Sequence, residues 1–148
     1  MEKTPIEMIR ILPADKFADA EKFIKLGEQL NCKSKVRFAV AHKTWKCVFS
    51  KRKPSRVLFT VECTDAIWQI KAMLSNIEKY KDALDHLIHL IKTAYDCHKC
   101  NNHCKGPNPF TIDGIEYRKC LGCSFYFPEL DCADQDSLLA LIKREAVY

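Results

Sequence analysis

The sequence is poor in residues that interrupt helices and strands, with only four glycines and six prolines among its 148 residues. No stretch approaches 18 consecutive apolar residues, so we expect no membrane-spanning helix and no membrane partner. The first residues also lack the apolar core of a secretory signal. These absences predict a cytoplasmic protein with short loops.

Motifs that organise catalysis are missing as well. The chain has no glycine-rich nucleotide-binding loop, no G-x-S-x-G and no H-E-x-x-H. A protein without enzymatic activity is therefore the favoured interpretation, and an enzyme that works through cysteine thiols stays open as an alternative.

Acidic residues are absent from the whole stretch between Gln29 and Val61, which holds nine of the 24 basic residues. The rest of the chain has 19 acidic residues against 15 basic ones. A basic sheet face with interleaved aromatic residues can hold nucleic acid through phosphate contacts and base stacking, or an acidic small ligand. The plainer alternative is a solvated strand face whose lysines protect an edge from aggregation. The candidate residues for an anionic partner are Lys33, Lys35, Arg37, Lys51, Arg52 and Lys53.

Hydrophobic periodicity predicts an α+β fold. Apolar residues at helical spacing indicate a helix from about Asp15 to Leu30, with Asp15 as its N-cap. Residues 1–13 before it are expected to form a short strand or an irregular lead-in. Alternating apolar residues then predict an antiparallel meander of about four strands joined by short hairpins. The expected strands centre on residues 36–40, 45–49, 56–63 and 67–74.

The clearest helical pattern runs from about Asn76 to Cys97, and its apolar stripe should cover the sheet. The Asp113-Gly114 pair between β-forming residues then predicts a two-residue hairpin. A short strand at 124–127 follows, and Asp134 or Asp136 should cap a last helix. We expect residues 1–96 to form an α+β domain packed by two helices, and residues 97–148 to form a cysteine-rich segment docked on it.

Five of the nine cysteines lie within residues 97–123. Two C-x2-C pairs there are separated by 19 residues, which is the spacing of zinc ribbons, and four thiolates form a closed, structural site. The odd number of cysteines favours reduced thiols and a metal over a disulfide framework. One ligand set is Cys97, Cys100, Cys120 and Cys123; the other is Cys97, Cys100, Cys104 and Cys120, with His103 as a further substitute.

These thiols have two other possible uses besides binding zinc. Four cysteines also hold iron–sulfur clusters. Redox-active C-x2-C motifs stand at helix N-termini, where the dipole lowers the thiol pKa, whereas Cys97 follows an expected helix C-terminus. Outside the cluster, we interpret Cys32, Cys47 and Cys63 as small buried apolar residues.

The tail resembles a family of small uncharacterised bacterial proteins. The pattern is Cys97-x2-Cys100-x3-Cys104-x-Gly106, followed by Gly114-x-Glu116-Tyr117-x2-Cys120 and a short terminal helix. This resemblance implies Cys97, Cys100, Cys104 and Cys120 as the ligand set and leaves Cys123 aside, but it implies no activity. The first 80 residues are loosely similar to small α+β domains of the MmcQ/YjbR-like kind.

The sequence therefore predicts a zinc-binding module that acts through a partner rather than by catalysis. A nucleic-acid-binding protein that uses the basic meander is one alternative, and a thiol-dependent redox enzyme is the other.

Overall fold

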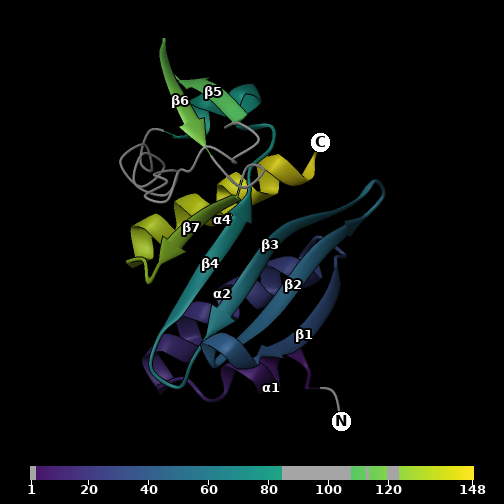
Figure 1. Ribbon diagram of the computed structural model, residues 1–148, viewed down its shortest axis with the longest axis vertical. Helices are drawn as coiled ribbons and strands as arrows, with labels where there is room; N and C mark the ends of the chain where they lie inside the picture. The colour runs from purple at the N-terminus through teal and green to yellow at the C-terminus, as the bar shows by residue number, and fades with distance from the viewer. Residues whose placement is uncertain (1–2, 85–107, 113, 120–123) are drawn as a thin grey trace.

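The computed structural model describes residues 3–84, 108–112, 114–119 and 124–148 (Figure 1). Within these residues two helices precede a series of antiparallel strands, and a last helix follows them. The helices are α1 (Pro5–Ile9), α2 (Ala14–Gln29) and α4 (Cys132–Ala146), with 3-10 helices η1 (Val40–His42) and η2 (Ile77–Leu84). The strands are β1 (Lys33–Ala39), β2 (Thr44–Arg52), β3 (Ser55–Cys63), β4 (Trp68–Met73), β5 (Asn108–Ile112), β6 (Ile115–Lys119) and β7 (Ser124–Pro128).

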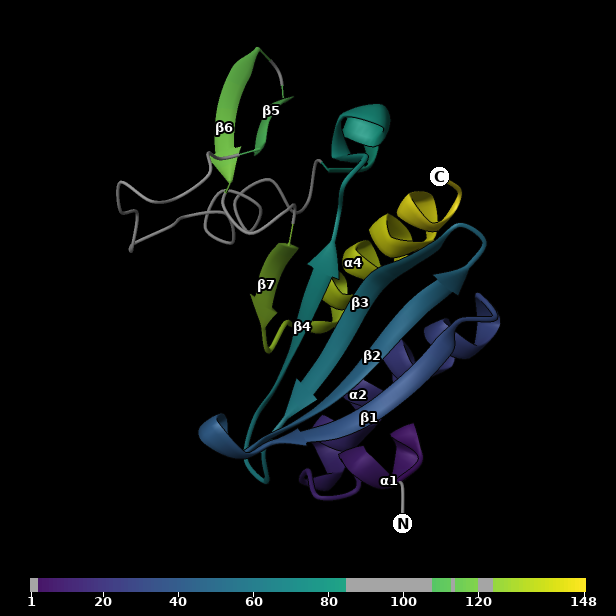
Figure 2. The ribbon, with the colours of Figure 1, turned by 45° about the vertical axis from the view of Figure 1, so that its right-hand side comes forward.

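A five-stranded antiparallel sheet with the order β1-β2-β3-β4-β7 forms the centre of the molecule (Figure 2). The first four strands are the predicted meander. The strand predicted at 124–127 is also present, but it extends this sheet by pairing with β4, and Ile70 lies opposite Phe127. The α+β class is therefore confirmed, and the sheet is one strand wider than expected.

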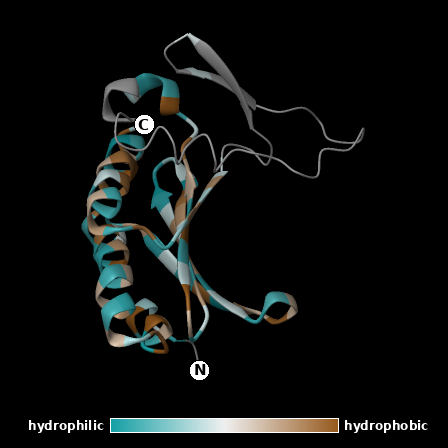
Figure 3. Cartoon of the chain, turned by 90° about the vertical axis from the view of Figure 1, so that its left-hand side faces the viewer, coloured by the Kyte–Doolittle hydropathy of each residue, from teal (hydrophilic) through white to brown (hydrophobic). Residues whose placement is uncertain are grey.

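Helices α1, α2 and α4 all lie on one side of the sheet (Figure 3). The close approach of α2 depends on Gly27, because a Cβ atom built there would lie 2.3 Å from Cδ1 of Phe49. Phe49 stacks on Phe59 with ring centroids 4.8 Å apart, and both side chains are buried. The apolar face of the sheet and the three helices thus enclose the main core.

The prediction for residues 1–13 was wrong, because residues 5–9 form helix α1. Thr4 caps this helix by accepting a hydrogen bond from the Glu7 amide at 3.2 Å, and Pro5 occupies its first turn, where a missing N–H costs nothing. Met8 and Ile9, two of the apolar residues in this segment, are fully buried in the core by this short helix.

Three other details differ from the expectations. Helix α2 begins one residue earlier than expected and has Pro13 rather than Asp15 as its N-cap. The cap of α4 is Asp131, whose Oδ1 accepts from the Asp134 amide at 2.8 Å, so neither Asp134 nor Asp136 is the cap. A regular α-helix from Asn76 was also wrong over residues 77–84, which form η2 with a break at Tyr80; residues 85–97 lie outside the described part of the chain.

The predicted hairpin at Gly114 is confirmed. Strands β5 and β6 pair antiparallel as a separate two-stranded sheet, with Ile112 opposite Ile115. Gly114 has φ of 77°, a left-handed conformation that suits glycine in a tight turn. The other end of this hairpin brings Asn108 opposite Lys119.

One buried carboxylate joins the last helix to the sheet. Glu145 on α4 is 1% exposed, and its Oε2 lies 2.9 Å from Nη2 of Arg56 on β3. The same carboxylate accepts hydrogen bonds from the amide and the side chain of Asn76 and from the Tyr80 hydroxyl, at 2.7–2.8 Å. Strand β3, the start of η2 and helix α4 therefore meet at one acceptor.

Candidate functional site: the open face of the sheet

The face of the sheet that points away from the three helices carries most of its exposed charge. Side chains alternate between the two faces of a strand, so the residues between the buried ones point to this open face. Its basic members come from three different strands, and β7 adds a tyrosine. The basic residues are Lys33, Lys35 and Arg37 from β1, Lys46 from β2 and Lys71 from β4, and the tyrosine is Tyr126.

The strand register arranges this face in rows that cross the sheet. In one row Lys35 lies opposite Val48, and the row continues through Thr60 to Lys71 and Tyr126. Because neighbouring strands are about 4.8 Å apart, this row spans roughly 19 Å. The Nζ atom of Lys71 lies 5.4 Å from the centre of the Tyr126 ring, so its cation and the aromatic surface stand together.

The next row contains the one acidic residue of the described part of this face. Arg37 lies opposite Lys46, and the row continues through Glu62 to Gln69. The Glu62 side chain is 7% exposed and its Oε2 lies 3.7 Å from Nζ of Lys46. One carboxylate is thus set into a surface that is otherwise basic.

The structure divides the six residues predicted for an anionic partner into two groups. Lys33, Lys35 and Arg37 lie together on the open face of β1. Lys51, Arg52 and Lys53 lie at the hairpin between β2 and β3, and Nε of Arg52 donates to the Asn31 carbonyl at the end of α2. Only the first group therefore joins the rows across the sheet.

Sequence reasoning missed Lys71, Tyr126 and Glu62 as members of this surface. The alternation of polar and apolar residues in each strand identifies which side chains share a face. It does not show which strands are neighbours, and Tyr126 reaches the surface only because β7 pairs with β4.

The three cysteines interpreted as buried lie on or beside the helix-covered side of the sheet. Cys47 and Cys63 are fully buried, whereas Cys32 is half-buried. Burial raises the pKa of Cys47 to about 12 and that of Cys63 to about 11, and it also raises the pKa of Cys32 against the opposing effect of Arg52 and Lys51. A raised pKa disfavours the nucleophilic thiolate, so none of these thiols suits redox chemistry.

The stability of the fold should consequently decrease in alkali. Above pH 9 the thiols of Cys47 and Cys63 ionise in the unfolded chain but stay protonated in the folded one, up to about pH 11. The unfolded state then binds fewer protons, so the free energy of unfolding falls by about 1.4 kcal/mol per pH unit for each thiol. Urea unfolding at several pH values should show a shallower decline for Cys47→Ala/Cys63→Ala than for wild type.

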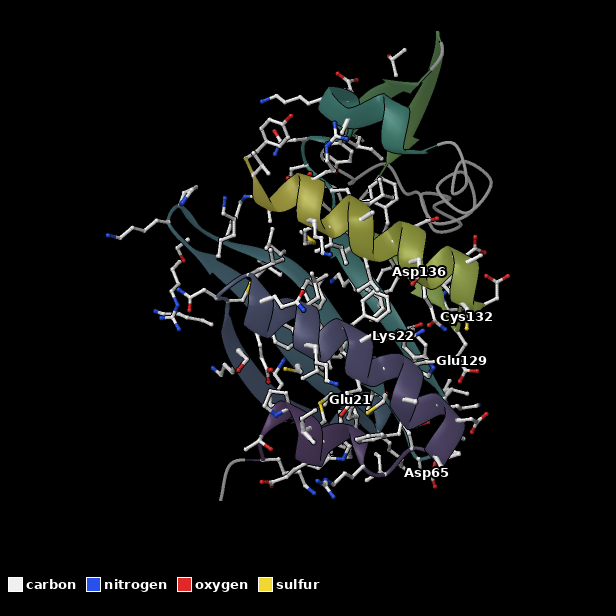
Figure 4. All side chains as sticks on the ribbon, turned by 180° about the vertical axis from the view of Figure 1, so that it is seen from behind. Glu21, Lys22, Asp65, Glu129, Cys132 and Asp136 are labelled. Carbon is white, nitrogen blue, oxygen red and sulfur yellow. The ribbon has the colours of Figure 1, made fainter. Side chains whose placement is uncertain are left out.

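The exposed Cys132 offers the control for this measurement. It lies at the start of α4 on the helix-bearing side of the molecule, where Figure 4 shows it near Glu129. Cys132→Ala should leave the alkaline slope as it is in wild type. An equal slope in the double variant and wild type would contradict the burial argument.

The residues predicted to bind zinc lie outside the described part of the chain: Cys97, Cys100, His103, Cys104, Cys120 and Cys123. The hairpin register bears on them indirectly. Cys120 follows Lys119 directly, and Lys119 pairs with Asn108. Cys104 precedes Asn108 by four residues, and four residues of chain reach at most about 14 Å. Among the described residues, no three His, Cys, Asp or Glu side chains are grouped so that they could hold a metal ion.

No protein-family model, curated protein or solved structure matches this chain. The resemblance of the tail to a bacterial family therefore stays a prediction, and the function is argued from geometry. Among the helices of the described residues, none is both long and apolar enough to cross a bilayer.

Proposed function

We propose that this protein is a binding module without catalytic activity whose open sheet face holds single-stranded nucleic acid. The observation that supports this proposal is the spread of cations over the open face, on β1, β2 and β4, with the Tyr126 ring beside Lys71. Cations spread over three strands suit a chain of phosphates better than a small anion. The aromatic ring at the end of the row offers a surface on which a base can stack.

Removing the cations of β1 should weaken binding and lower its dependence on salt. The variant Lys33→Gln/Lys35→Gln/Arg37→Gln loses three phosphate-binding charges, and its slope of log affinity against log salt should fall by about 2. Fluorescence anisotropy with a labelled single-stranded oligonucleotide at several salt concentrations measures both quantities. All three residues are exposed, so the fold should not change.

A variant with the same loss of charge elsewhere supplies the control. Arg10, Lys25 and Lys143 are exposed and belong to the helices or their ends. Arg10→Gln/Lys25→Gln/Lys143→Gln should keep the wild-type salt slope. Equal slopes for the two triple variants would show that binding reflects net charge alone and would refute the role of the open face.

We also propose a structural zinc site at the base of the β5–β6 hairpin, held by Cys97, Cys100, Cys104 and Cys120, with Cys123 and His103 as substitutes. The pairing of Asn108 with Lys119 supports it, because it returns the chain from one cysteine segment to the other. Four thiolates suit Zn²⁺, and a closed set supplies folding energy rather than chemistry. An iron–sulfur cluster is the other metal group that such a set accepts.

A further inference from the structure

A small cleft opens at one end of the open face, where the turn between β3 and β4 meets the start of β2. Its volume is about 90 Å³, and Glu62, Gln69, Thr44 and Ile67 contribute to its lining. The Thr64 hydroxyl accepts hydrogen bonds from the amides of the turn, at residues 66 and 67, so this wall is fixed. A cleft of this size holds the edge of one planar ring.

The polar groups of the cleft are mainly acceptors. Oε1 of Glu62 accepts from Nε2 of Gln69 at 2.8 Å, which turns the carbonyl end of the Gln69 amide away from Glu62. The Thr44 hydroxyl donates to the His42 carbonyl at 2.9 Å and keeps its lone pairs. A carboxylate has about four acceptor positions, so Glu62 can still receive two parallel N–H groups.

One donor flanks this carboxylate. Nζ of Lys46 lies 3.7 Å from Oε2 of Glu62, which is beyond hydrogen-bond distance, and an ammonium has three protons to donate. Lys46 does not line the cleft itself, but it places a cationic donor beside Glu62, the carboxylate of the lining that can accept two hydrogen bonds. A ligand complementary to these groups has an edge with one hydrogen-bond acceptor beside two adjacent donors.

We propose that this cleft binds the Watson–Crick edge of an unpaired guanine within the nucleic-acid strand. Guanine alone among the common bases presents O6 as an acceptor followed by the N1–H and N2–H donors. Lys46 would donate to O6, and Glu62 would accept from N1–H and N2–H. This inference rests on the proposed function, because it concerns one base of the strand that the open face is proposed to bind. The phosphates of that strand would still be bound by the cations of the open face.

The other bases fit this arrangement less well. Adenine and cytosine each place a ring nitrogen acceptor beside their amino group, and that acceptor would face the carboxylate. Uracil and thymine have one N–H between two carbonyl groups. An arginine side chain of a protein partner also has two parallel donors, but Lys46, Arg37 and Lys71 on the same face repel a cation.

Binding of matched oligonucleotides tests the inference. The probes are a thymidine oligonucleotide and the same strand with one central guanine, hypoxanthine or adenine. Wild-type protein should bind the guanine strand about tenfold more tightly than the thymidine strand, and the hypoxanthine strand in between, because it lacks the N2 donors. Glu62→Gln should abolish the preference for guanine while it leaves the affinity for thymidine equal or higher, since the variant removes a negative charge.

Asp65→Asn is the matched control, because Asp65 is an exposed carboxylate of the neighbouring turn. It should retain the guanine preference. Equal wild-type affinity for all four strands would overturn the inference and leave the proposed function standing. Absence of binding to any strand would overturn both, and tighter binding of an arginine-containing peptide than of the guanine strand would overturn the assignment to guanine. The comparison of guanine with hypoxanthine uses only the wild-type protein, so it decides the matter even if Glu62→Gln does not fold.

Discussion

Replacing Glu145 by glutamine should destabilise the protein by about 3–5 kcal/mol, which is the cost of leaving one partner of a buried ion pair without its counter-charge. In the wild-type protein the carboxylate faces donors only: Nη2 of Arg56, both nitrogens of Asn76 and the Tyr80 hydroxyl. An amide in its place would point its own N–H groups at some of these donors. Because stabilities of single domains are often 5–15 kcal/mol, much of the total would be lost.

A variant of Tyr80 measures what one neutral hydrogen bond to Glu145 contributes to stability. Burial and the neighbouring Glu145 carboxylate raise the pKa of the Tyr80 hydroxyl, so it stays protonated and donates at 2.7 Å. Tyr80→Phe removes one hydrogen bond and leaves the other donors in place, and it should cost about 1–2 kcal/mol. The expected order of stability is wild type, Tyr80→Phe, then Glu145→Gln.

Chemical unfolding followed by circular dichroism measures these differences. The control is Glu21→Gln, because Glu21 forms a partly exposed pair with Lys25 at 3.5 Å and should contribute less than 1 kcal/mol. A cost for Glu145→Gln as small as that for Glu21→Gln would show that the cluster does not hold α4 on the sheet.

Removal of the proposed zinc should have the second large effect. Native mass spectrometry of protein purified without oxygen should show one Zn²⁺ per chain. A strong chelator should unfold the hairpin region, because structural zinc supplies about 10–16 kcal/mol in small zinc modules. Hydrogen exchange at residues 108–119 before and after chelation reports this change by segment.

Two single substitutions separate the alternative ligand sets. Cys104→Ser should lose the metal and Cys123→Ser should keep it if the set is Cys97, Cys100, Cys104 and Cys120. The opposite outcome would restore the set with the two C-x2-C pairs. An apo mass together with full protection of the hairpin would refute a structural metal.

The parts of the fold that were predictable have a local cause. The helical spacing of apolar residues such as Phe23 and Ile24 identified α2. The alternation of apolar and polar residues around Cys47 and Phe49 identified β2. Gly114 identified the hairpin because few other residues adopt its positive φ. In each case the signal lies within one element or one turn.

The errors have a local cause too, because short elements give few repeats of a period. Helix α1 has only five residues, so the apolar residues in and after it, from Ile6 to Leu12, were too few to distinguish a helix from a strand or an irregular lead-in. The cap of α4 was misplaced by three or five residues, because Asp131, Asp134 and Asp136 carry the same side chain and the sequence does not distinguish them. Hydrogen-bond geometry distinguishes them.

The candidate site was only partly predictable because it depends on strand order. The cations of β1 were visible as a pattern, whereas Lys71 and Tyr126 joined them through pairing between distant segments. No pattern in the sequence singles out Glu62, and only the neighbouring strands show that it is buried beside Lys46 and Gln69.

The pairing of β7 with β4 also has a consequence for how the chain reaches its folded state. Strand β4 ends at Met73 and β7 begins at Ser124, so this pair closes a long loop. During synthesis, one edge of β4 stays unpaired until β7, near the end of the chain, is made. Unpaired strand edges can pair with other chains and promote aggregation. A metal bound between the cysteine segments would shorten the effective loop and reduce the entropy lost on closure. The metal site would then act first as an aid to folding, before any contribution to the finished structure.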